Sequence, residues 1–189
     1  GSDIFGNCRD LETVELAEGT TTIGETMFFG CGNLMSIQIP DSVTTIGKQA
    51  FESALGSVTF SPSSKLTAIG EGAFRDSGIR EIVIPETVTS IGDGAFSGGG
   101  GPSTVLKTVT FKGPPPSLAS DVFNGATDLT IRYPYRYASE WDSVKNQDYG
   151  AISTTWTAYN ETTAIVCGYC GDEGDGSNVQ WEYDLTSHT

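Results

Sequence analysis

The sequence predicts a solenoid, a β-rich coil with one parallel sheet and short helical or 3-10 turns. Three recurring features of the 189 residues predict it. An Ile-Gly pair returns at steps of 23, 23 and 22 residues, an Ala-Phe or Met-Phe pair follows, and a short apolar alternation comes next. Self-similarity at a fixed period of about 20–50 residues is typical of stacked repeats. We count about five to six repeats, with Ile-Gly pairs at Ile23–Gly24, Ile46–Gly47, Ile69–Gly70 and Ile91–Gly92.

The apolar alternation predicts one half-buried strand per repeat. In the second repeat Ile37 and Ile39 point to one side, and Ser36 and Gln38 point to the other. Pro40 ends the strand, because proline has no N–H to donate to a ladder. Equivalent strands are expected at 14–16, 58–60, 82–84, 109–111 and 131–133, and we expect all six to stack into one parallel sheet.

The second half of each repeat returns the chain to the start of the next strand. Asp41–Ser42 is turn chemistry, Val43 and Ile46 pack inward, and Gly47 marks a tight backbone position. The Ala-Phe pair is expected in a short helical turn that fills the coil. Stacked coils would align these rings into an aromatic spine, the main source of stability, at Phe28, Phe51, Phe74, Phe96 and Phe123.

A threonine precedes each Ile-Gly pair by two residues. A regular row of threonines can bind ice or a polymer. Alternatively, the hydroxyls bond to neighbouring backbone, as stacked coils require. The row consists of Thr21, Thr44, Thr67 and Thr89.

The repeat resembles that of the BspA-like leucine-rich repeats, also called the Treponema pallidum-type class. Residues 37–51, which include Pro40, Val43, Thr44 and the Ile46–Gly47 pair, match its pattern almost fully, and the resemblance covers roughly residues 5–134. It implies a right-handed leucine-rich-repeat coil. It also implies a secreted or cell-surface bacterial protein that binds proteins, with adhesion to host or microbial proteins as its role. The first repeat departs from the pattern, with Ala17–Glu18 in place of the usual Pro-Asp.

A second segment is expected after residue 134. Residues 1–133 carry 15 acids and 8 bases and residues 134–189 carry 9 acids and 2 bases, so each part has a net charge of −7 and the shorter one is far more acidic. We therefore divide the chain into a solenoid, 1–134, and a C-terminal cap helix and β segment, 135–189. Tyr137, Trp141 and Val144 lie at helical spacing, and Trp141 is expected to shield the last coil.

The end of the chain contains two further strand patterns. Residues 152–158 and 179–185 alternate, and we expect them to pair, with Trp156 and Trp181 on a shared apolar face and an irregular loop at 171–178. Residues 170–181 also resemble the opening of a β-module found between repeat blocks of the family. We therefore expect the native protein to continue beyond Thr189.

The four cysteines form two pairs in the sequence. Cys8 and Cys31 occupy equivalent repeat positions and are expected as buried thiols in register. Cys167 and Cys170 form a C-x-x-C that suits a local disulfide, two free thiols, half a zinc site or a redox pair. The acidic loop from Asp172 to Asn178 is either a solvated turn or a calcium loop without EF-hand spacing.

The composition argues against several functions. The net charge of −14 argues against nucleic acid and anionic membrane surfaces, and no apolar run is long enough to span a membrane. His188 is the only histidine and no catalytic motif occurs, so we expect neither an enzyme nor a cofactor.

Three functions remain, and the sequence leaves the oligomeric state open. The first is a surface or secreted module that binds proteins, the second is a structural spacer, and the third is a glycan-binding accessory domain. The outward strand positions form the candidate binding face. They are small and polar, without an aromatic ring to anchor a partner: Thr13, Glu15, Ser36, Gln38, Ser57, Thr59, Glu81, Val83, Thr108, Thr110, Thr130 and Arg132.

Overall fold

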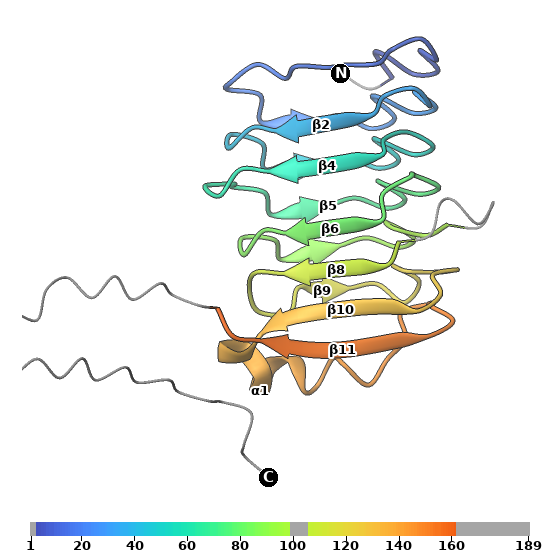
Figure 1. Ribbon diagram of the computed structural model, residues 1–189. Coiled ribbons are helices and arrows are strands. Elements are labelled where there is room, and N and C mark those ends of the chain that lie inside the picture. The colour runs from blue at the N-terminus through green and yellow to red at the C-terminus, as the bar shows by residue number, and fades with distance from the viewer. Residues whose placement is uncertain (1–2, 99–105, 162–189) are drawn as a thin grey trace, which may run out of the picture.

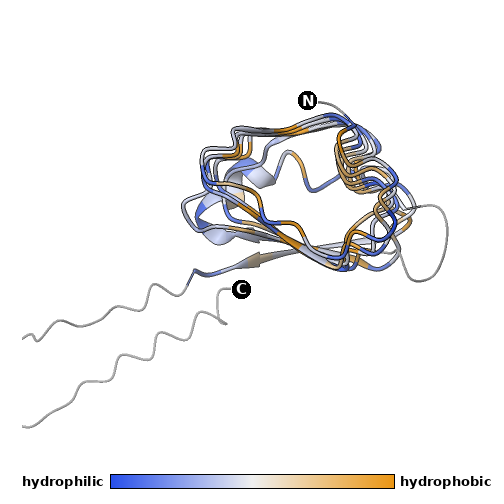
Figure 2. Ribbon diagram, turned by 90° about the horizontal axis from the view of Figure 1, so that it is seen from above, coloured by the Kyte–Doolittle hydropathy of each residue, from blue (hydrophilic) through white to orange (hydrophobic). Residues whose placement is uncertain are grey.

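The chain winds into a stack of coils whose strands run across the solenoid axis (Figure 1). The structure, a computed structural model, describes residues 3–98 and 106–161. Viewed down the axis, successive coils superpose (Figure 2), and their buried apolar side chains form one core cluster. This arrangement confirms the predicted solenoid. In the described residues most coils contribute one strand to a long face and, opposite it, a two-residue strand to a second sheet.

The long face is built from parallel strands in the predicted register. Ile37 lies opposite Val58, and Val109 lies between Ile82 and Ile131. The strands are β2 (Ser36–Ile39), β4 (Ser57–Phe60), β6 (Glu81–Ile84), β8 (Thr108–Phe111), β10 (Leu129–Pro134) and β11 (Thr154–Tyr159).

The prediction of one continuous sheet on this face is wrong. Strands β2 and β4 form one sheet, and β6, β8, β10 and β11 form another. The interruption lies next to a longer loop. Seven residues, 61–67, separate β4 from the next strand, whereas only five residues separate β2 and β6 from the strands that follow them. The expected first strand, 14–16, is also absent, and that coil makes only a bridge between Thr13 and Ser36.

The opposite side of the coil is a five-stranded parallel sheet that the sequence did not predict. Its strands have two residues each, so their alternation is too short to detect. They are β1 (Thr22–Ile23), β3 (Thr45–Ile46), β5 (Ala68–Ile69), β7 (Ser90–Ile91) and β9 (Ser117–Leu118). Beside this sheet, the hydroxyl of Thr67 donates to the carbonyl of Thr44 at 3.0 Å, and Thr44 and Thr89 bond in the same way to the preceding coil. The threonine hydroxyls therefore bond neighbouring coils to one another.

The glycines of the Ile-Gly pairs allow the coils to approach closely. A Cβ on Gly70 would lie 2.7 Å from the carbonyl carbon of Gly47, and one on Gly92 would lie 2.6 Å from the amide nitrogen of Glu71. Neither glycine has a positive φ, so the lack of a side chain is what matters at these positions. This confirms the tight backbone position expected at Gly47.

The aromatic spine is present as predicted and extends to Phe5. Neighbouring rings are stacked with centroids 5.2–6.0 Å apart. The Ala-Phe pairs lie in consecutive turns rather than in helices, held by bonds such as Ala50 N–H to the carbonyl of Gly47. Cys31 is buried beside the spine and its thiol donates to the carbonyl of Phe5, but Cys8 is exposed, so the prediction of two buried thiols is wrong for Cys8.

Trp141 closes the last coils as predicted. It lies at the end of α1 (Ala138–Trp141), which follows the 3-10 turn η1 (Tyr135–Tyr137), and it is fully buried. Its ring packs on Phe111, Tyr133 and Trp156 with centroids 4.8–5.8 Å apart, and its indole N–H donates to the carbonyl of Gly113.

Strand β11 continues the repeat sheet by pairing with β10 over six residues. Trp156 is half-buried and faces Trp141, whereas Ile152 lies outside the strand and is exposed, contrary to expectation. The cap thus packs directly on the solenoid. The division at residue 134 stays a prediction, and the expected partner of β11, 179–185, lies outside the described residues.

Candidate binding face

The predicted face exists as a row of outward side chains along the stack. On β2, β4 and β6 its members are exposed, while Thr108, Thr110 and Thr130 are half-buried and Arg132 is exposed. Thr13 and Glu15 are also exposed, although their coil forms no strand. The alternation of apolar and polar residues therefore predicted which side chains point outward, even in the first coil, where no strand forms.

Part of this face is hollowed into a groove of about 1250 Å³. Its floor crosses β4, β6, β8 and β10, and seven of the predicted residues line it. One wall is the 61–65 loop, and Arg136 and Glu161 close the opposite end. The predicted residues in the groove are Ser57, Thr59, Glu81, Val83, Thr108, Thr110 and Arg132, whereas Thr13, Glu15, Ser36, Gln38 and Thr130 lie outside it.

Val83 supplies an apolar centre to the groove. Its side chain points outward from β6 and is 49% exposed, and threonines lie on either side of it in β4 and β8. Exposed branched side chains at such a position offer apolar area that a partner can cover. The groove thus combines hydroxyl groups with one apolar contact.

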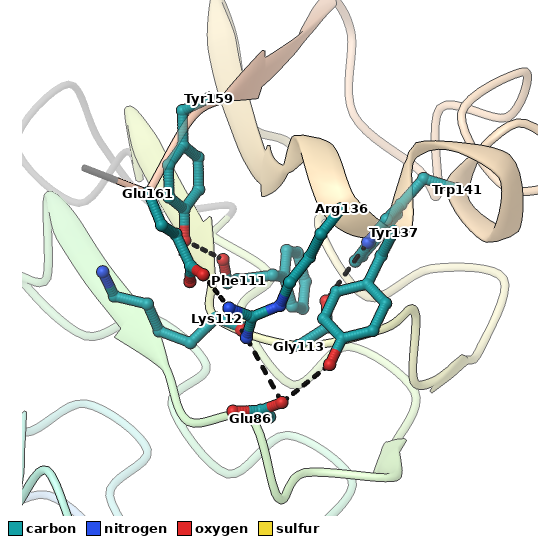
Figure 3. A network of polar contacts seen from close by, with 9 residues as sticks. All are labelled: Glu86, Phe111, Lys112, Gly113, Arg136, Tyr137, Trp141, Tyr159 and Glu161. Atoms are coloured by element: carbon teal, nitrogen blue, oxygen red, sulfur yellow. Dashed lines mark hydrogen bonds and ion pairs between the residues drawn. The ribbon is translucent and has the colours of Figure 1, made fainter. Parts of the chain in front are cut away.

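The end of the groove at β10 is a polar corner that the sequence reasoning missed (Figure 3). Arg136 from η1 forms ion pairs with Glu86, at 3.3 Å, and with Glu161, and it also donates to the carbonyl of Lys112. The phenol of Tyr137 donates to the same Glu86 carboxylate at 2.7 Å. The hydrogen bond with Tyr137 is the largest cause that raises the pKa of the Arg136 guanidinium, and the charge of Glu86 is a smaller one.

Tyr159 gives the corner an aromatic ring. Its hydroxyl donates to the carbonyl of Phe111 at 2.8 Å, which ties the end of β11 to β8. Burial raises the pKa of this phenol, and the cations of Arg136 and Arg132 oppose that rise. The ammonium of Lys112 lies 5.4 Å from the ring centroid, and the guanidinium carbon of Arg132 lies 5.5 Å from it.

The expectation of a face without an aromatic ring is therefore wrong at this corner. Tyr159 stands in register with Pro134, on the outward alternation of a strand that was assigned to a separate segment. Lys112 likewise continues the outward alternation of Thr108 and Thr110, one residue beyond the strand. Extending both alternations would have found these two residues.

The remaining predicted features lie near the end of the chain. Cys167 and Cys170, the acidic loop and the strand at 179–185 lie outside the described residues. Within residues 3–98 and 106–161, no group of three or more His, Cys, Asp or Glu side chains is placed to hold a metal ion. In the same part of the chain, no helix has the length and apolar character needed to cross a membrane.

Stacked coils, a parallel sheet along one side and a groove across its strands define a leucine-rich-repeat solenoid. The chain belongs to the BspA-type leucine rich repeat family, whose model matches residues 1–100. This fold commonly mediates protein binding and is typically non-enzymatic, and the family is typically associated with bacterial surfaces. No curated protein matches the chain.

The solved structures that the chain resembles include two bacterial leucine-rich repeat proteins. A leucine-rich repeat protein from Bacteroides ovatus is 27% identical with a TM-score of 0.59, covering 70% of this chain and 34% of its own length. The leucine-rich repeat protein TpLRR from T. pallidum is 24% identical with a TM-score of 0.58, covering 84% of this chain and 78% of its own, and it supports the fold alone. The chain thus spans about a third of the B. ovatus protein.

Proposed function

We propose that this chain is a non-enzymatic module of a secreted or cell-surface protein, and that it adheres to host or microbial proteins through the groove on its long face. The observation that carries the proposal is the groove itself, which crosses four strands and has the exposed Val83 on its floor. Because binding requires area that a partner can cover, this hollowed part of the face is the best-suited surface of the described chain.

The composition of the groove suits an extended segment of a partner protein. Backbone groups of such a segment can bond to the hydroxyls of Thr59, Thr108 and Thr110, which line the floor. A small side chain of the partner can cover Val83. Adhesion is the role that best combines a protein-binding fold with a family typically found at bacterial surfaces.

Binding of the purified chain to immobilised extracellular-matrix, plasma and bacterial surface proteins tests this proposal. The variant Val83→Glu places a charge in the groove, while Ile152→Glu makes the same change at a side chain that is 73% exposed and does not line it. A partner should bind the wild type and Ile152→Glu alike and lose at least tenfold in affinity for Val83→Glu. If no protein in the panel binds, the proposed adhesion role is wrong. If both variants bind a partner as tightly as the wild type does, the groove is not the binding site.

A further inference from the structure

Two cations at the corner of the groove have no carboxylate partner among the described residues. Four cations of that part of the chain, Lys48, Lys107, Arg136 and Lys145, form ion pairs. Lys112 and Arg132, which both line the groove, form none there. Both carboxylates nearby, those of Glu86 and Glu161, are engaged by Arg136.

These two cations both approach one aromatic ring. Both approach the ring of Tyr159 at about the distance of a cation–π contact, 5.4 and 5.5 Å. The hydroxyl of Tyr159 donates to the carbonyl of Phe111, and this bond restrains the orientation of the ring. A single anion beside this ring would be attracted by both positive charges.

The corner therefore differs in charge from the rest of the chain. Lys112, Arg132 and Arg136 stand against the two carboxylates of Glu86 and Glu161, which leaves a local charge of +1 in a chain of −14. The rest of the groove is not basic: it has hydroxyl groups, Val83 and the carboxylate of Glu81, with Lys65 on the far wall. A ligand with many negative charges would be repelled there, and a ligand with one would be accepted at the corner.

We propose that Lys112 and Arg132 bind one carboxylate of an extended partner peptide, either an Asp or Glu side chain or a terminal carboxylate, and so set which segment the groove accepts. This inference rests on the proposed function and names the chemistry of the partner. Four strands spaced about 4.8 Å apart give a floor roughly 15 Å wide, which matches about four to five extended residues at about 3.3 Å each. The ligand is thus an extended peptide with one acid at the corner and small or β-branched residues beyond it.

Selection from a random 12-residue peptide library displayed on phage, with the full chain as bait, tests this proposal. Selected peptides should share an acidic residue, or a free terminal carboxylate, next to small or branched residues. Their affinities are then measured by fluorescence polarisation with synthetic labelled peptides and with matched peptides in which the acid is replaced by its amide. We expect the amide peptide to bind about tenfold more weakly, the effect of one charged hydrogen bond.

Three variants of the chain complete the experiment. Lys112→Gln and Arg132→Gln should each weaken the acidic peptide about tenfold and leave the amide peptide nearly unchanged, whereas Lys112→Arg should retain most of the affinity because it keeps the charge. Arg9→Gln is the matched control, since it removes an exposed cation from the first coil, outside the groove. Thermal melts verify that each variant remains folded.

The outcomes separate this inference from the proposed function. Peptides that are sensitive to Val83→Glu but show no preference for an acid leave the groove as the protein-binding site and overturn the carboxylate site. The carboxylate site is also overturned if no peptide binds with a Kd below about 1 mM, a threshold that corresponds to about −4 kcal/mol. Retention on heparin that is lost in Lys112→Gln and Arg132→Gln would assign the corner to a sulfated glycan, and a dimer that both variants abolish would assign it to a second copy of the chain. Either result contradicts the peptide proposal.

Discussion

Replacing Gly70 with alanine is expected to destabilise the solenoid, although removing a glycine usually stabilises a protein. The added Cβ would lie 2.7 Å from both the carbonyl carbon of Gly47 and the amide nitrogen of Lys48, and 3.0 Å from the carbonyl oxygen of Gly47. All three atoms belong to the backbone of the preceding coil, so no side chain can rotate away. Only a wider separation of the two coils relieves the overlap.

The cost of that separation follows from the contacts between the coils. Ordinary carbon contacts begin near 3.4 Å, so the coils must separate locally by about 0.7 Å. The hydrogen bond from Gly70 N–H to the carbonyl of Ile46, now 2.8 Å, would then approach 3.5 Å, where it is weak. Overpacking of this kind costs about 1–3 kcal/mol, and the entropy that alanine removes from the unfolded chain returns about 0.4–1 kcal/mol. We expect a net loss of about 1–2 kcal/mol.

Urea unfolding followed by circular dichroism measures this loss. Gly32→Ala is the matched control, because a Cβ at Gly32 meets no atom within 4 Å and its φ is not positive. The control should be neutral or slightly stabilising, so its midpoint should stay at or slightly above the wild-type midpoint while that of Gly70→Ala falls. Equal midpoints for the two variants would refute the close approach of the coils.

Three further predictions concern the core and the sheets. Phe51→Ala and Phe74→Ala should each lower the free energy of unfolding by about 3–5 kcal/mol in urea melts, because each removes a fully packed spine ring; losses below about 1 kcal/mol would place the rings outside the core. Trp141→Phe should cost more than Trp156→Phe in the same assay, since the indole N–H of Trp141 bonds to Gly113 and that of Trp156 has no hydrogen-bond partner in the described structure. In hydrogen exchange, amides of β6 should exchange faster than those of β8, which is paired on both sides, and equal rates would contradict the interrupted ladder.

The buried side chains were predictable because the residues that fill the interior of a solenoid recur in the sequence at the repeat period. Each coil must present the same side chains to its neighbours, so Phe28, Phe51 and Phe74 recur at one period and their stacking could be read directly. The register at Ile37 and Val58 followed for the same reason. The two-residue strands opposite could not be predicted, because two residues contain no measurable alternation.

The corner of the binding face was missed for a different reason. Its members come from three places far apart in the sequence: Glu86 after β6, Lys112 after β8, and Arg136 and Tyr159 from the cap. A comparison of repeats shows what the coils share, and it does not show that these four side chains meet. They meet because β11 adds to the repeat sheet, a pairing that the charge difference at residue 134 did not suggest.

The two sides of the coil explain where a partner can bind. The two-residue strands are joined without a break, and the hydroxyls of the threonines that precede β3, β5 and β7 bond to the neighbouring coil, so this side holds the stack together. The long face varies in its loops, and between β4 and β6 it gives up ladder pairing. The groove lies across this interruption and ends at the cationic corner around Tyr159. The spine and the second sheet already stabilise the coils, so residues of the long face can differ from the repeat pattern without loss of the fold. We place the partner at the groove, where they differ.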